Sequence, residues 1–190
     1  MFSYIKKEKI TAGLVVAFLT FFIALLVSLG SEALVMAMNS VALAILLLLG
    51  IIIFGIFFDI IGTAATASSL PPFNAKAAKK IFGAKQAVKI NLNADVVANL
   101  CNDVIGDIAG ILSGAIGAGI VISLKSTIPL FDMVLVSAAM TSIVAALTVG
   151  GKAIGKSIAI DNANEIILKA GLILGWFEKL TGIEMFQNRR

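Results

Sequence analysis

Five polar side chains stand out because they lie at the ends of apolar runs long enough to cross a bilayer. They are Asp59, Asn102, Asp103, Asp107 and Lys152. An ionisable group inside a membrane span costs about 2.5–3.5 kcal/mol, so its presence calls for a partner or a function. Carboxylate, amide and carbonyl oxygens are the ligands that hard cations such as Mg²⁺ prefer. The pattern therefore predicts an ion site, with Asp59, Asn102, Asp103 and Asp107 as the candidate metal ligands.

Asp59 and Lys152 each allow two interpretations. Asp59 closes an apolar run in the segment FFDIIGTAATASSLPP at 57–72. We expect it to stop the membrane helix, and to be an ion ligand only if Lys152 does not occupy the same cavity. Lys152 either pairs with Asp59 or Asp103, which would lower the affinity for cations, or extends to the lipid headgroups, as we expect of Lys156.

The residues around Asp107 combine acidic and small side chains. Asp103 and Asp107 are four residues apart and would share one face of an α-helix. Gly106, Gly110 and Gly114 repeat at the same spacing. Such a repeat permits close helix packing, or it exposes backbone carbonyls along an ion path. We expect close packing.

The composition is that of an integral membrane protein. Of 190 residues, 59% are hydrophobic and 14% are charged, and histidine is absent. The net charge of +4 comes from lysines beside the apolar runs, so it does not predict a nucleic-acid partner. No nucleophile–base pair or phosphate-binding glycine loop is present, so we do not expect an enzyme. A single cysteine, Cys101, excludes an internal disulfide.

Four apolar segments predict an all-α membrane domain with four transmembrane helices, each about 20 residues long. They are Thr11 to Leu29, Ala33 to Phe58, Val104 to Leu124 and Met133 to Gly151. Three lysines precede the first segment and five lie in residues 62–101. By the positive-inside rule both termini and this long loop are cytoplasmic. We expect the protein in a prokaryotic plasma membrane.

Two further helical segments are predicted outside the spans. In residues 71–94, apolar residues and lysines alternate at helical spacing after two prolines, which predicts a cytoplasmic juxtamembrane helical hairpin with lysines near anionic headgroups. A merely solvated basic loop is the alternative. Asn162 followed by Glu165 is a capping-box pattern. The helix that it begins is apolar but interrupted by charges, which predicts a C-terminal amphipathic interfacial helix with Trp176 at the headgroup level.

Three short motifs occur in this framework. Phe57-Phe58-Asp59 precedes Gly62-Thr63-Ala64-Ala65, the triplet Cys101-Asn102-Asp103 begins the third span, and Gly151-Lys152-Ala153-Ile154-Gly155-Lys156 ends the fourth. With the order of helices from residue 41 onward, they resemble the transmembrane domain of the CNNM/CorC magnesium transporter family. We therefore divide the single membrane domain, 1–190, into an additional N-terminal helix (1–32), a three-helix core (41–157) with its hairpin (71–94), and a belt helix (158–186).

The resemblance implies a site for Mg²⁺ between the helices, formed by serine, asparagine and glutamate side chains. At the positions that match the family's ligands, only Asn102 keeps the family's residue type. Asp59 stands in place of the serine, and Gly62 and Lys152 stand in place of glutamates. Two hypotheses follow. One is a Mg²⁺ transport protein, embedded in the lipid bilayer as a homodimer joined by glycine- and alanine-rich helix faces, with an inward-facing acidic cavity. The other is a non-transporting scaffold or partner subunit whose ion site is neutralised by Lys152.

Overall fold

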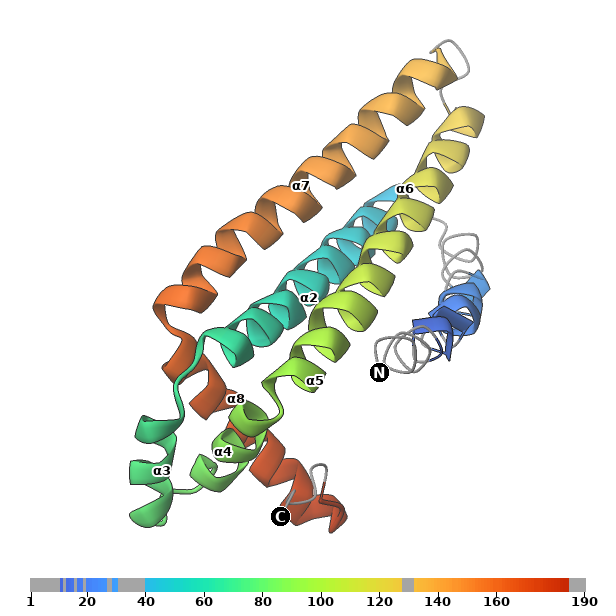
Figure 1. The fold of residues 1–190 in the computed structure, drawn as a ribbon. Helices are drawn as coiled ribbons and strands as arrows, with labels where there is room; N and C mark the ends of the chain where they lie inside the picture. The colour runs from blue at the N-terminus through green and yellow to red at the C-terminus, as the bar shows by residue number, and fades with distance from the viewer. Residues whose placement is uncertain are drawn as a thin grey trace, which may run out of the picture. The chain divides into compact units, whose positions relative to one another are not determined.

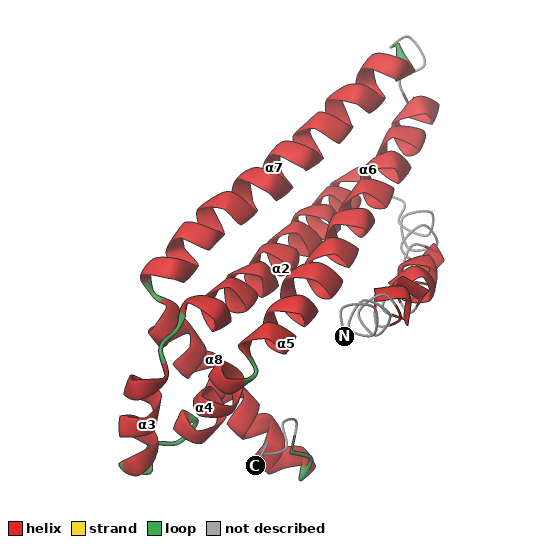
Figure 2. Ribbon diagram, viewed as in Figure 1, coloured by secondary structure: helices red, strands yellow, loops and turns green. Residues whose placement is uncertain are grey.

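The computed structural model is helical and describes most of the chain. It covers residues 11, 13–15, 17–18, 20–26, 29–30, 40–127 and 132–184. Helices and short turns make up these residues, and no strand occurs among them (Figures 1 and 2). The expectation of an all-helical chain is therefore confirmed for the described residues.

Among the described residues, three helical segments are long and apolar enough to cross a membrane. They are α2 (Val41–Ala67), the continuous stretch Ala94–Leu124, and α7 (Met133–Asp161). The second comprises α5 (Ala94–Ala98), the π-helix η1 (Asn99–Gly106) and most of α6 (Asp107–Thr127). The additional span predicted at Thr11 to Leu29 lies partly outside the described residues, so it stays a prediction.

Two predicted helix ends are wrong. Helix α2 does not end at Asp59 but continues to Ala67, and α7 continues to Asp161, beyond the end of the apolar segment predicted at Gly151. Asp59 is only 2% exposed, so it lies inside the packed part of α2 rather than at its end. The alanines that follow favour the helix, and Ala64 and Ala65 are buried. The apolar run therefore predicted that a membrane-spanning helix is present, but it did not predict where the helix ends.

The contacts of the chain define two units, each with its own interior. The first comprises residues 1–52 and 108–146, and the second comprises residues 53–107 and 147–190. Within the first unit, α2 buries Ala44, Leu48 and Ile52 at intervals of four residues. Helix α6 buries Ile116 and Ile120 at the same interval, so each helix has one packed face.

The second unit has an apolar core to which every helix in it contributes. Besides the ends of α2 and α7, the unit contains α3 (Leu70–Ala78), α4 (Ala84–Leu92), α5, η1 and α8 (Ala163–Thr181). Its buried residues include Ala64, Phe73, Ala87, Ile90, Val97, Cys101, Ala159, Ala163 and Ile167. The short helices α3 and α4 occupy the segment in which the hairpin was predicted, and their cytoplasmic location stays a prediction.

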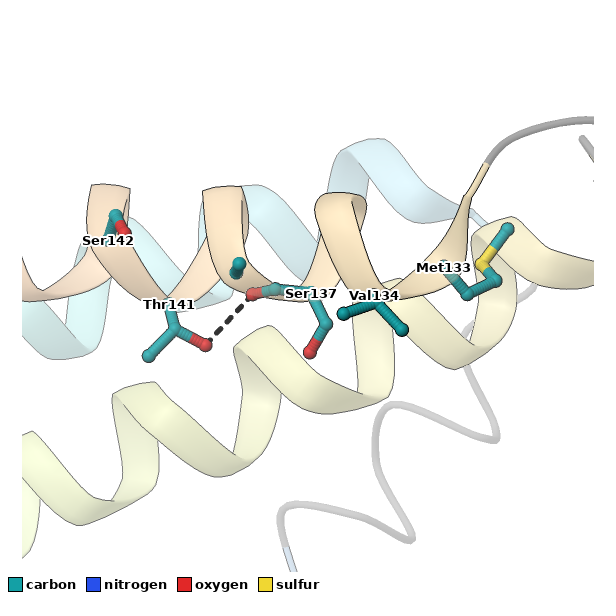
Figure 3. A pocket seen from close by; sticks show the side chains of 6 residues that line it. Met133, Val134, Ser137, Thr141 and Ser142 are labelled. Carbon is teal, nitrogen blue, oxygen red and sulfur yellow. Dashed lines mark hydrogen bonds between the residues drawn. The ribbon is translucent and has the colours of Figure 1, made fainter.

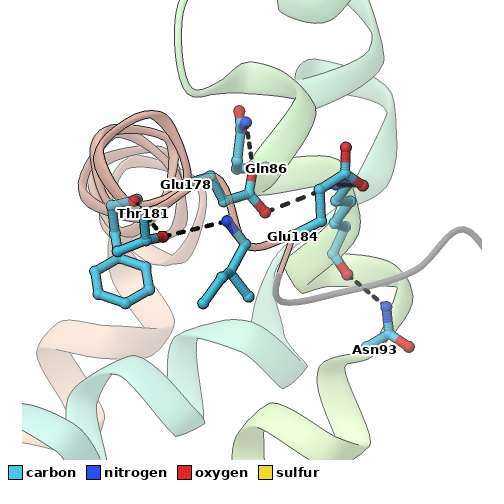
Figure 4. A network of polar contacts seen from close by, with 8 residues as sticks. Gln86, Asn93, Glu178, Thr181 and Glu184 are labelled. Carbon is cyan, nitrogen blue, oxygen red and sulfur yellow. Dashed lines mark hydrogen bonds and ion pairs between the residues drawn. The ribbon is translucent and has the colours of Figure 1, made fainter.

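Helices α4 and α8 approach each other closely and are joined by a polar network (Figure 4). A Cβ atom at Gly171 would lie 2.5 Å from the carbonyl oxygen of Gly83 and 2.8 Å from the backbone nitrogen of Ala87. Beside this contact, the Gln86 amide donates to Glu178 at 2.9 Å and Lys89 Nζ lies 3.1 Å from Glu184. Only glycine permits this distance between the two backbones.

Helix α8 begins after Asn162, as its capping pattern predicts, but the capping-box hydrogen bonds are not made. The Asn162 amide instead donates to the Ile158 carbonyl at 3.1 Å. Glu165 accepts a hydrogen bond from Lys169 Nζ at 2.8 Å, which holds the pKa of Glu165 below its usual range. The pattern thus predicted the start of the helix correctly. Glu165, however, pairs with Lys169 one turn further along the helix and not with the backbone at Asn162.

The α4–α8 contact predicts that Gly171→Ala destabilises the protein by about 1–3 kcal/mol, because the new methyl group would force two backbones apart. Gly150→Ala is the matched control, since it lies in α7 with no atom within 4 Å of the added Cβ. It should be neutral or slightly stabilising. Unfolding of both variants in the same detergent would measure the difference, and equal stabilities would contradict the close contact.

Candidate functional site

The candidate site depends on a close approach between α2 and α7. A Cβ atom at Gly155 would lie 2.9 Å from Ile60 Cγ1 and 3.3 Å from Ile56 Cγ2, and one at Gly151 would collide with the Ile56 side chain. The two glycines are one helical turn apart and so are the two isoleucines. Small residues at this spacing allow helices to pack closely in a membrane.

This contact places the Lys152 side chain among oxygen atoms. Its Nζ lies 3.9 Å from Asp59 Oδ1 and 3.8 Å from Asp107 Oδ1, and it donates a long hydrogen bond of 3.4 Å to the Gly106 carbonyl. We call Asp59, Asp107, Lys152 and Lys156 the charged cluster. The structure therefore favours the interpretation in which Lys152 faces the carboxylates.

The π-helix η1 supplies one side of the cluster. It widens the backbone over Asn99–Gly106 and passes directly into the first turn of α6 at Asp107. A Cβ atom at Gly106 would lie 3.2 Å from the Cys101 carbonyl oxygen and 3.3 Å from Lys152 Nζ. A side chain at Gly106 would thus crowd the ammonium group. Single π-helical turns often occur at functional sites.

Asp59 is the most deeply buried charged group of the cluster. Its Oδ2 atom lies 3.9 Å from Lys156 Nζ and has no hydrogen-bond partner. Lys156 is half exposed, and its ammonium group faces Asp59. The sequence had led us to expect that it would extend toward the lipid headgroups. Two unit charges about 4 Å apart attract by roughly 4 kcal/mol at an effective dielectric constant of about 20, so the two ammonium groups offset part of the cost of burying Asp59.

Asn102 lies near the cluster with an unused acceptor. Its Oδ1 is buried, makes no hydrogen bond, and packs against Gly62, where an added Cβ would collide with it. Gly62 is three residues after Asp59 and therefore on a neighbouring part of the same face of α2. A buried acceptor without a donor is costly, so this side chain requires an explanation.

The charges of the cluster do not fit a site for Mg²⁺. Two carboxylates face two ammonium groups, so their formal charges cancel. No group of three or more His, Cys, Asp or Glu side chains that could hold a metal ion occurs among the described residues. Asp103 is exposed and has no ion pair within the described part of the chain. Of the predicted ligands, Asp59 and Asp107 approach the same ammonium group.

The predicted packing glycines have different surroundings. No atom lies within 4 Å of a Cβ added at Gly110 or at Gly114. Gly114 instead lines a cavity of about 90 Å³ between α6 and α7. Of the three predicted glycines, only Gly106 has close neighbours, Cys101 and Lys152. Several of the closest helix contacts in the described chain are instead made by glycines for which no packing role was predicted, among them Gly151 and Gly155. Their small-xxx-small spacing was the signal that could have identified them.

A second hollow lies along the first turns of α7 (Figure 3). It measures about 670 Å³ and is lined by Met133, Val134, Ser137, Ala138, Thr141 and Ser142. The Thr141 hydroxyl donates to the Ser137 carbonyl of its own helix at 2.9 Å. No charged side chain lines this hollow.

Comparisons with known proteins do not identify a family. No protein-family model matches the sequence, and neither a curated protein nor a solved structure matches it. The resemblance to the CNNM/CorC family therefore stays a prediction.

The cluster predicts unequal roles for its two lysines. Lys152→Met would leave Asp59 and Asp107 without the ammonium group they share, and should destabilise the protein by about 3 kcal/mol, near the lower end for breaking a buried pair. Lys156 is 52% exposed, so solvent already weakens its attraction. Lys156→Met should cost less than about 1 kcal/mol. Unfolding in detergent would test both, and equal losses would contradict this assignment.

Proposed function

We propose that this chain is a membrane scaffold or partner subunit that does not transport ions. The observation that carries the proposal is the position of Lys152, whose ammonium group lies between Asp59 and Asp107. A tethered positive charge there repels a free cation and competes for the same oxygens. Bringing Mg²⁺ to ligand distances of about 2.1 Å would require the lysine to leave.

The exposed surface of α7 supports a role in assembly. In the most apolar 18-residue stretch of α7, only 6% is buried within the chain. The corresponding stretch of Ala94–Leu124 is 39% buried. Besides Met133 and Val134, the hollow at its first turns is lined by small and hydroxyl-bearing side chains, which suit contact with another helix in a membrane. A second copy of this chain or a different membrane subunit would fit this surface.

Cation transport, with Mg²⁺ as the ion that the resemblance implies, is the second candidate function. It is favoured by two buried oxygens without a hydrogen bond, Asp59 Oδ2 and Asn102 Oδ1. Such atoms are the type of ligand that a hard cation uses. For transport, Lys152 would have to move away from Asp59 during the cycle.

Mg²⁺ uptake into proteoliposomes separates the two functions. We expect the wild type to show no uptake above protein-free vesicles, because the site is already neutralised. Lys152→Glu reverses the charge beside Asp59, and we expect this variant to gain Mg²⁺ binding in calorimetry. The matched control Lys169→Glu makes the same change on the exposed part of α8 and should gain none.

Uptake by the wild type would overturn the scaffold proposal if both Asp59→Asn and Asn102→Ala abolished it. Under the scaffold proposal, Asn102→Ala should instead leave the protein folded and change its stability by less than about 1 kcal/mol, because the lost oxygen makes no hydrogen bond.

A further inference from the structure

Helix α8 has two apolar faces, of which one is covered by the chain itself. The covered face repeats every four residues and consists of Ala163, Ile167, Gly171 and Gly175, all buried. The backbone of Gly171 packs on Gly83 and Ala87, and Gly175 faces the side chains of Gln86 and Phe82. This face therefore belongs to the contact with α4 and the turn that precedes it.

The other face of α8 is made of large apolar side chains that contact little. Ile173, Trp176 and Leu180 are 65%, 64% and 66% exposed, and Phe177 beside them is 45% exposed. Their spacing of three, four and seven residues places them on one side of the helix. We call these four residues the outer apolar face.

The place of α8 in the chain indicates what covers the outer apolar face. Asn162 alone separates the end of α7, a helix long enough to span a membrane, from the start of α8. Figure 1 shows α8 turning steeply away from the direction of α7. A helix that leaves a span in this way begins at the membrane surface.

The side chains of α8 fit the boundary between headgroups and acyl chains. Tryptophan is enriched at this level of the bilayer, since its ring is apolar and its N–H remains wet. Lysine lies next to the apolar face at Lys179, and the exposed Lys169 is paired with Glu165. A helix with one apolar face and flanking charges lies in the interface plane, buried by about 5–10 Å.

We propose that the outer apolar face of α8 inserts into the headgroup–acyl boundary of the lipid bilayer. Helix α8 would then hold the α3–α4 pair at the membrane, because α4 packs against the covered face of α8 at Gly171 and Gly175. Lys89 of α4 pairs with Glu178 near the end of α8 and with Glu184 in the segment after it. This surface is independent of the charged cluster.

Trp176 is the single tryptophan of the chain and reports its own depth. The intact protein is reconstituted in phosphatidylcholine vesicles whose lipids are brominated either near the headgroup or near the middle of the acyl chain. We expect lipid brominated near the headgroup to remove most of the Trp176 emission and lipid brominated deeper to remove less. Aqueous iodide should have little effect.

Matched variants localise the effect. Leu180→Asn should weaken quenching by the brominated lipid and admit iodide, whereas Lys179→Asn, at the adjacent position off the face, should leave both unchanged. A second reporter, Phe177→Trp in a Trp176→Phe background, should show the same shallow quenching. This reporter tests the surface without a new polar group on α8.

Two outcomes would overturn the proposal. Quenching of Trp176 by iodide with no response to brominated lipid would place the face in water. Protection from both quenchers would mean that a second copy or another protein covers it.

Discussion

The packing of two glycines on two isoleucines is the contact on which the charged cluster depends. Gly151 and Gly155 let α7 lie close to α2 at Ile56 and Ile60. Lys152 is between these glycines in the sequence, so its side chain is carried to Asp59, the residue beside Ile60. Larger residues at the glycine positions would separate the helices and leave a buried carboxylate without its counter-charge, which is among the costliest changes in a protein interior.

The charge balance of the cluster links this packing to function. A transport site must attract a cation and then release it, and it therefore needs negative charge that is not already neutralised. Here Lys152 and Lys156 supply two positive charges to Asp59 and Asp107. The same arrangement that stabilises the fold thus opposes ion binding, and this is the physical basis for proposing a structural rather than a transporting role. The interfacial placement proposed for α8 does not depend on this balance.

Sequence reasoning predicted the class of the fold and part of the site. Apolar runs identified three long helices correctly, because length and hydropathy suffice for that. They predicted that α2 ends at Asp59, because a charged residue after an apolar run usually marks the end of a membrane span. The pairing with Lys152, which allows this carboxylate to be buried within the helix, is not visible in the apolar pattern. Asp59 and Lys152 were named as a possible pair, while the π-helix at Asn99–Gly106 was not anticipated. The π-helix depends on tertiary packing, which short-range patterns do not report. The close contact at Gly155, by contrast, had a signal in the sequence, the four-residue spacing of Gly151 and Gly155.

The coupling energy between Asp59 and Lys152 measures whether the ammonium group neutralises the buried carboxylate. A double-mutant cycle with Asp59→Asn, Lys152→Met and the combined variant would be measured by unfolding in one detergent system. If the ammonium group neutralises the buried carboxylate, the double variant should be more stable than the sum of the single losses by about 1 kcal/mol or more. Additive losses would show that the two side chains do not interact, and would contradict the account of a neutralised site.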